Sequence, residues 1–150
     1  MIDLSTDYLG LRLKNPLVPS ASPLSKSLDS LLLLEDAGAA AVVLHSLYEE
    51  ELIAEDAMTE RFLLNGELHD AEATGFLPDH GNFQGALERY LEHLRLAKAR
   101  LDIPVIASLN GVSSGGWTDY ALRMQEAGAD AIELNIYYLP TDPHLSGAEL

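Results

Sequence analysis

One short phrase occurs twice in this chain, and it restricts the folds that the chain can adopt. The segment EDAGAAAVVLH at residues 35–45 aligns with QEAGADAIELN at residues 125–135. In each copy a helix is predicted to end at a glycine, Gly38 or Gly128, because glycine readily takes the positive φ of a helix C-terminus. The apolar run that follows is short and contains β-branched residues, as is typical of a strand covered on both faces. The phrase therefore predicts two helix-to-strand units of an α/β fold.

Apolar runs and turn residues predict a similar alternation along most of the chain. A β-hairpin is expected at 5–14, and Ser27 is a suitable N-cap for a helix that ends at Gly38. The expected strands are 17–20, 41–44, 103–108 and 131–134, and two further helices are expected at 87–97 and 117–127. Such alternation indicates a parallel sheet with right-handed crossovers. An open doubly wound sheet and a (β/α)8 barrel both fit, and four strands supply half of a barrel, which needs roughly 250 residues.

An acidic insertion at 47–82 interrupts this pattern. It carries ten acidic residues and one base, Arg61. A short helix is expected at 50–62, and the remainder is expected to leave the regular fold. A long insertion between units is either a lid or contact surface, or a solvated loop, and the sequence favours neither.

Charge and composition exclude several classes of function. The chain has 24 Asp plus Glu against 9 Lys plus Arg, a net charge of −15, so a nucleic-acid partner is not expected. No apolar run approaches the roughly 18 residues of a membrane span, and the N-terminus lacks the pattern of a signal peptide. There is no cysteine, and the histidines lack helical zinc-binding spacing, so no metal site is expected. These features predict a cytoplasmic protein without a membrane partner.

Four predicted strand ends carry a family resemblance. They read NPLVPSAS at 15–22, VLHS at 43–46, IPVIASLNG at 103–111 and ELN at 133–135. In order and spacing they resemble the N-terminal half of dihydroorotate dehydrogenases and related FMN-dependent oxidoreductases. Those proteins are TIM (β/α)8 barrels that oxidise dihydroorotate to orotate in pyrimidine biosynthesis. The resemblance implies one partial TIM-barrel domain over 1–150, with the hairpin at 5–14, βα units at 17–46, 83–108 and 116–135, and the acidic insertion at 47–82.

The resemblance also implies roles for individual residues. Small side chains are expected against the flavin ring, where a flat ring must approach the backbone closely. Amide groups are expected to orient flavin or substrate, because an amide both donates and accepts hydrogen bonds. The implied FMN-binding residues are Ser20, Ala21, Ser22, His45, Ser46, Asn110 and Asn135, and the last two are also implied in substrate binding.

Three positions depart from the family pattern. His45 stands in place of a lysine that can steady negative charge on reduced flavin, which histidine does only when protonated. Tyr138 stands in place of the proton-abstracting cysteine or serine, and Pro140 in place of an asparagine. Tyr138 is therefore the candidate proton carrier, and the substrate is either dihydroorotate or a related cyclic compound. In the family, later strands supply the FMN phosphate site, so the 150-residue chain is expected to be an incomplete portion and inactive alone.

Two other classes of function remain open. A half barrel leaves strand edges unpaired, so the chain could be a non-catalytic scaffold, and a homo-oligomer is expected in either case. Another phosphate-handling barrel, such as an aldolase or isomerase, would need a lysine or carboxylate at a strand's carboxyl end. Glu133 is near such an end, and strand alternation places it on the same face as Asn135.

Overall fold

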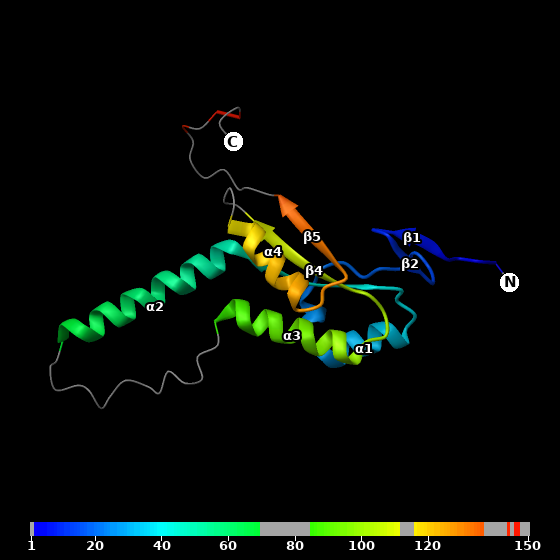
Figure 1. Cartoon of the computed structure of the whole chain (residues 1–150), viewed down its shortest axis with the longest axis horizontal. Helices are drawn as coiled ribbons and strands as arrows, with labels where there is room; N and C mark the ends of the chain where they lie inside the picture. Colours follow the sequence, from blue (N-terminus) through cyan, green and yellow to red (C-terminus); the bar gives the residue numbers. More distant parts are fainter. Residues whose placement is uncertain (1, 70–84, 112–115, 137–143, 145, 148–150) are drawn as a thin grey trace.

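The computed structural model describes residues 2–69, 85–111, 116–136, 144, 146 and 147. Two short antiparallel strands, β1 (Thr6–Tyr8) and β2 (Leu11–Leu13), precede a main sheet of three parallel strands in the order β3 (Val42–Tyr48), β4 (Val105–Gly111) and β5 (Ala131–Ile136). The helical elements are η1 (Pro23–Lys26), α1 (Leu28–Asp36), α2 (Glu49–His69), α3 (Ala86–Arg100) and α4 (Gly116–Glu126). Figure 1 shows α2 extending away from the sheet. The α/β class and the parallel sheet are confirmed, and the half barrel remains a prediction.

The repeated phrase forms the structure expected of it. Gly38 and Gly128 both have φ of +101°, which a side chain would disfavour, and each follows a helix and precedes a strand. Ser27 is the N-cap of α1, and its side chain accepts a hydrogen bond from the Ser30 amide. Local sequence therefore determines where these elements begin and end.

The predicted strand at 17–20 is wrong as a regular strand. This segment runs beside β3, because the carbonyls of Leu17 and Pro19 accept hydrogen bonds from the amides of Ala40 and Val43. The return bonds are missing for two physical reasons. Pro19 has no N–H, and the Leu17 amide donates instead to the side chain of Asn15. The segment thus covers the start of β3 without forming a ladder.

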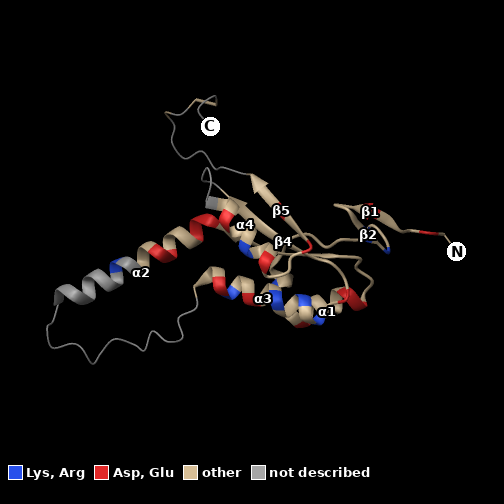
Figure 2. Ribbon diagram, in the orientation of Figure 1, with Lys and Arg blue, Asp and Glu red and all other residues tan. Residues whose placement is uncertain are grey.

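The start of the acidic insertion is also different from the prediction. β3 continues to Tyr48, and Leu47 is buried, so residues 47 and 48 belong to the sheet rather than to an insertion. Helix α2 begins at Glu49 and extends to His69, seven residues beyond the expected helix end. Residues 70–82 lie outside the described part of the chain. Figure 2 shows acidic residues along the first turns of α2 and basic residues on α3.

The two faces of the main sheet are buried differently. On one face, Leu44, Ala107 and Leu109 pack with apolar residues of α3 such as Leu91 and Leu94. On the other face, a smaller cluster covers only the beginnings of the strands; its buried members are Leu13, Ala40, Ala41, Val43 and Ile106. The second face is therefore apolar at its amino end, which leaves its carboxyl end for polar side chains.

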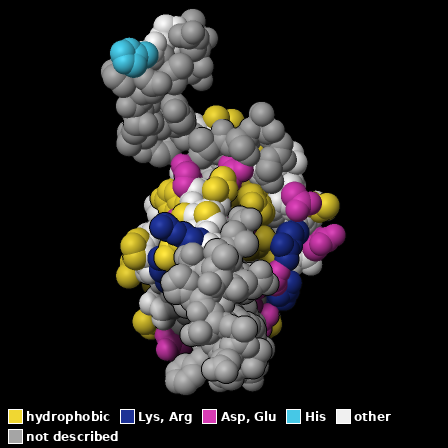
Figure 3. Space-filling view, turned by 90° about the vertical axis from the view of Figure 1, so that its left-hand side faces the viewer, with side chains coloured by type: hydrophobic (Ala, Val, Ile, Leu, Met, Phe, Trp, Pro, Cys, Tyr) yellow, Lys and Arg dark blue, Asp and Glu magenta, His cyan; other side chains and the backbone are white. Residues whose placement is uncertain are grey.

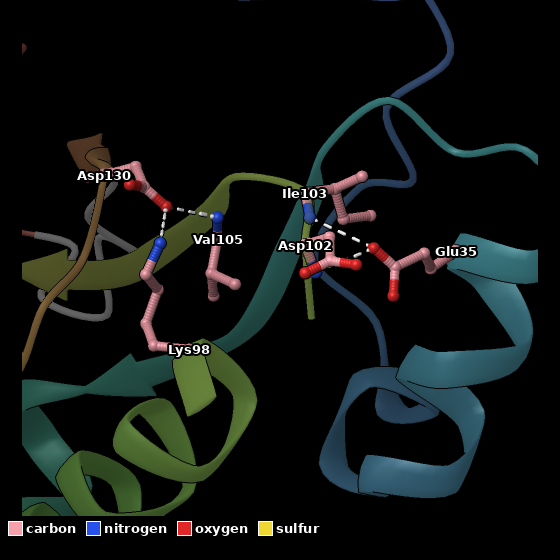
Figure 4. A network of polar contacts seen from close by, with 6 residues as sticks. All are labelled: Glu35, Lys98, Asp102, Ile103, Val105 and Asp130. Atoms are coloured by element: carbon pink, nitrogen blue, oxygen red, sulfur yellow. Dashed lines mark hydrogen bonds and ion pairs between the residues drawn. The ribbon is translucent and has the colours of Figure 1, made fainter. Parts of the chain in front are cut away.

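Two acidic side chains tie helices and loops to the start of the sheet (Figure 4). Glu35 Oε1 accepts hydrogen bonds from the amides of Asp102 and Ile103 at 2.9 and 3.0 Å. Asp130 Oδ2 accepts from the Val105 amide at 2.7 Å and from Lys98 Nζ at 2.6 Å. These hydrogen bonds satisfy the backbone N–H groups of Asp102, Ile103 and Val105, which donate to side chains instead of to a neighbouring strand. No helix in the described ranges is long and apolar enough to cross a membrane.

Candidate active site

An irregularity in β3 aligns polar side chains across the sheet. Val43 pairs with Ile106 and Ser46 pairs with Ser108, so β3 contains one residue more than β4 over this stretch. Such a bulge reverses the side-chain alternation beyond it. The next residues then form two rows on the face opposite α3: Ser46, Ser108 and Glu133 form the first row, and Tyr48, Asn110 and Asn135 form the second.

Ser108 is the hub of the hydrogen bonds in these rows. Its hydroxyl donates to Glu133 Oε1 at 2.9 Å, so the Ser46 hydroxyl donates to Ser108 Oγ, also at 2.9 Å. Asn135 Nδ2 donates to Ser108 Oγ at 3.3 Å and to Glu133 Oε1 at 3.4 Å. The Ser108 hydroxyl thus makes one donor and two acceptor bonds, which is its full capacity. Three neighbouring strands therefore contribute to one connected polar cluster.

Asn110 carries an unsatisfied buried atom in this cluster. Its residue surface is 4% exposed, and Oδ1 is buried without a hydrogen-bond partner among the described residues. Together with Ala21, Glu133 and Asn135 it lines a cavity of about 370 Å³. An unpaired buried carbonyl costs about 1–3 kcal/mol. A ligand N–H or O–H in the cavity would remove that cost, so this cavity is a candidate ligand site.

The hydroxyl of Tyr90, on α3, holds the backbone of β4 beside the bulge. It accepts a hydrogen bond from the Ser108 amide at 2.9 Å and donates to the Ser108 carbonyl at 3.3 Å. Tyr90 is buried, and burial raises the pKa of its phenol, so the hydroxyl keeps its proton. One helix side chain thus positions the residue at the hub of the polar cluster.

A second cavity, of about 500 Å³, adjoins the first and contains His45. The two cavities share Ala21, Ser46 and Tyr48. The His45 ring lies edge-on to Tyr90, with ring centroids 5.0 Å apart, and its Nδ1 is buried without a partner among the described residues. Burial, with smaller contributions from electrostatic repulsion by His93 and Lys26, lowers the pKa of His45 to about 4. His45 is therefore neutral near pH 7.

The implied site residues divide between these cavities. Ser20, Asn110 and Asn135 line the first, Ser22 and His45 line the second, and Ala21 and Ser46 line both. Tyr138 and Pro140 lie outside the described residues. Within the described ranges no three His, Asp or Glu side chains are grouped to hold a metal ion.

The sequence patterns did not predict several residues of the site, or predicted another role for them. Ser108 lies two residues before Asn110 in β4, so alternation along the strand could have placed it on the same face. Glu133 was weighed only for a different class of barrel. No pattern in the sequence pointed to Tyr90, because its contact with Ser108 joins residues of separate elements.

Comparison with known proteins shows that the chain is similar to proteins named as dehydrogenases. No family model matches it. It is 31% identical over 147 residues to "Dihydroorotate dehydrogenase B (NAD(+)), catalytic subunit" of Thermoplasma acidophilum, an alignment that covers 98% of this chain and 44% of that protein. It is 29% identical over 153 residues to "NAD-dependent dihydropyrimidine dehydrogenase subunit PreA" of Escherichia coli K12, covering 99% of this chain and 35% of that protein.

The alignments with these relatives extend along nearly the whole of this chain. The catalytic subunit of dihydroorotate dehydrogenase B from Methanosarcina mazei is 30% identical over 139 residues, which cover 92% of this chain and 40% of that protein. The chain spans less than half the length of these curated relatives. Over nearly its whole length the chain is similar to proteins of the dihydroorotate dehydrogenase-like family.

Proposed function

We propose that this chain carries part of the flavin- and substrate-binding face of an FMN-dependent oxidoreductase acting on dihydroorotate or a related cyclic compound. The relatives are named as dehydrogenases of dihydroorotate and of dihydropyrimidine, two rings with similar amide edges. Polar side chains at the carboxyl ends of β3, β4 and β5 support the same role, because parallel α/β folds place their sites at this edge.

The observation that carries the proposal is the unpaired carbonyl of Asn110 beside the amide of Asn135. Their residues lie side by side in the second polar row, and both line the first cavity. A flavin or pyrimidine edge presents ring N–H groups and carbonyls, which need acceptors and donors respectively. Asn110 Oδ1 supplies a buried acceptor. Both hydrogen bonds that Glu133 makes within the described residues use Oε1, so these bonds leave Oε2 as a second acceptor. The cavity therefore offers acceptors to the ring N–H groups of such an edge.

The small residues at one side of the cavity fit a flat ring. Ala21 lines both cavities, and Ser20 lines the first. Short side chains there let a ring approach the backbone closely. FMN, when bound, supplies the acceptor for a hydride from the substrate carbon.

Oxidation of a ring C–H pair also requires a group that takes a proton. Tyr138 remains the candidate from the sequence. In the described part of the first cavity, Glu133 and Tyr48 are the titratable side chains. In this proposal Ser108 and Asn135 orient Glu133 through their hydrogen bonds, and the cluster positions the substrate rather than reacting with it.

The proposal is tested by flavin binding with an Asn110→Leu variant. FMN added to the wild-type chain is expected to bind with quenched fluorescence. Asn110→Leu should weaken that binding by roughly tenfold or more, since it removes a buried hydrogen-bond acceptor. Its free energy of unfolding should stay the same or rise, because leucine has a similar size and leaves no unpaired buried carbonyl.

Asn15→Leu is the matched control. The Asn15 side chain bonds the Gly38 carbonyl and the Leu17 amide at 2.9 Å each and does not line the cavity. This variant should lose stability while the folded fraction binds FMN as the wild type does. Absence of FMN binding by the wild-type chain, or equal binding by Asn110→Leu, would contradict the proposal.

A further inference from the structure

The second cavity gathers basic side chains in a strongly acidic chain. The whole sequence has 9 Lys plus Arg and 5 His against 24 Asp plus Glu. Lys26, Arg89, His45 and His93 all line this one cavity, and Glu51 is the acidic residue on its wall. Figure 3, which looks onto the α2 end of the molecule, shows basic side chains in small groups among acidic and hydrophobic ones. His45 is neutral near pH 7 and adds no charge, but a lysine and an arginine on the wall of one cavity suit an anionic ligand.

Three different elements hold these basic groups in place. Lys26 ends η1, whereas Arg89 and His93 lie on α3 and His45 on β3. His93 Nε2 lies 2.7 Å from the Ser25 carbonyl, which only accepts, so this nitrogen carries the proton. The bond ties α3 to η1 and so holds Lys26 beside the cavity. Arg89 pairs with Glu55 on α2 at 3.4 Å.

The surroundings of His45 are consistent with an anion in this space. The His93 ring centroid lies 5.7 Å from that of His45, and electrostatic repulsion from His93 and Lys26 helps to lower the pKa of His45. A cation would be repelled there. A metal ion would lack ligands, since the His93 nitrogen bonded to Ser25 is protonated and no third ligand group is present among the described residues.

We propose that the second cavity binds the anionic group of a ligand, a carboxylate or a phosphate, through Lys26 and Arg89. A single ligand can place its ring in the first cavity and its anionic group in the second, since Ala21, Ser46 and Tyr48 line both cavities. The role of that ligand as substrate or cofactor rests on the proposed function, whereas the anion contact does not. Carboxylate and phosphate oxygens both suit the fork of an arginine and the point charge of a lysine.

Two matched pairs of probes distinguish the sources of the charge. Orotate and uracil differ by a carboxylate, and FMN and riboflavin differ by a phosphate. Dissociation constants are measured by calorimetry for each probe, and for inorganic phosphate, with the 150-residue chain. At least one anionic probe should bind more tightly than its neutral partner, and the preference should fall as salt is added. Preference within the first pair identifies a carboxylate, and preference within the second identifies a phosphate.

Lysine variants locate the contact. Lys26→Met should weaken binding of the preferred anion by roughly five- to tenfold, as expected for one charge-assisted contact at a partly open site. Lys26→Arg should retain it. Lys14→Met makes the same charge change at an exposed lysine that does not line the cavity, and should have little effect. Circular dichroism checks that each variant is folded, which exposed Lys26 should not disturb.

The outcomes separate this inference from the proposed function. Binding of orotate or phosphate that depends on Lys26, without any flavin binding, would support the anion site and contradict the flavoprotein. The inference is overturned if no anionic probe binds, if neither pair shows a preference, or if Lys14→Met and Lys26→Met weaken binding equally.

Discussion

At the scale of single residues, His45 makes stability depend on pH. Its pKa is about 4 in the folded chain and near 6.5 in an unfolded one. Between these values the unfolded state binds the extra proton, so stability falls as the pH falls from about 6.5 toward 4. The loss attributable to His45 is expected to be on the order of 1–2 kcal/mol, after allowance for the partial exposure of the ring. Urea unfolding of the wild type and His45→Phe across this range measures it.

His45→Phe keeps an aromatic ring against Tyr90 but cannot titrate. Carboxylates titrate in both proteins, so the informative quantity is the difference between their free energies of unfolding at each pH. That difference should shift in favour of the variant as the pH is lowered through the window. Parallel curves for the two proteins would show that folding does not lower the pKa of His45.

At the scale of elements, one hydroxyl couples α3 to the irregular part of the sheet. Tyr90→Phe leaves the buried amide and carbonyl of Ser108 without that partner. The expected loss is about 1–3 kcal/mol in the free energy of unfolding. Hydrogen exchange at the Ser108 amide should become faster in the variant. Tyr120→Phe on α4 is the control, because that hydroxyl makes no hydrogen bond with the described residues, and its loss of stability should be much smaller. An equal loss in the two variants would refute the coupling.

At the scale of the whole molecule, we expect copies of the chain to interact through the edge of β5. Among the described strands β5 pairs only with β4, and Ile136 at its end is 87% exposed. Exposed strand edges favour association, whereas a net charge of −15 opposes it. The chain is therefore expected to self-associate, and more strongly as salt screens the repulsion. Sedimentation velocity over a range of protein and salt concentrations measures this behaviour.

Paired substitutions test whether the β5 edge is responsible. Ile136→Lys places a charge at the edge and should shift the distribution toward monomer. Leu33→Lys makes the same kind of change on α1, where the side chain is 67% exposed, and should leave more association than Ile136→Lys does. A monomer under all conditions, or the same response to both changes, would contradict the prediction.

The polar site shows why only part of it could be predicted. Asn110 and Asn135 stood out because each follows a predicted strand, and both line one cavity. Ser108 becomes the hub only because β3 has an extra residue before Ser46, and this bulge is visible only in the pairing of β3 with β4. The sequence left open whether His45 carries a charge; burial favours the neutral ring, and Lys26 from a separate element lines the same cavity.

What the sequence alone determined is local. Gly38 and Gly128 end helices because of their own backbone freedom, Ser27 caps α1 with its own side chain, and short apolar runs form strands. Pro19 also acts locally: because it has no N–H, residues 17–20 do not form the regular strand that their apolar pattern predicted. Only the tertiary structure decided the register of β3, the bond from Tyr90 and the grouping of basic side chains. Those features depend on contacts between distant segments, whose geometry is set when the whole sheet packs against its helices and not by neighbours along the chain.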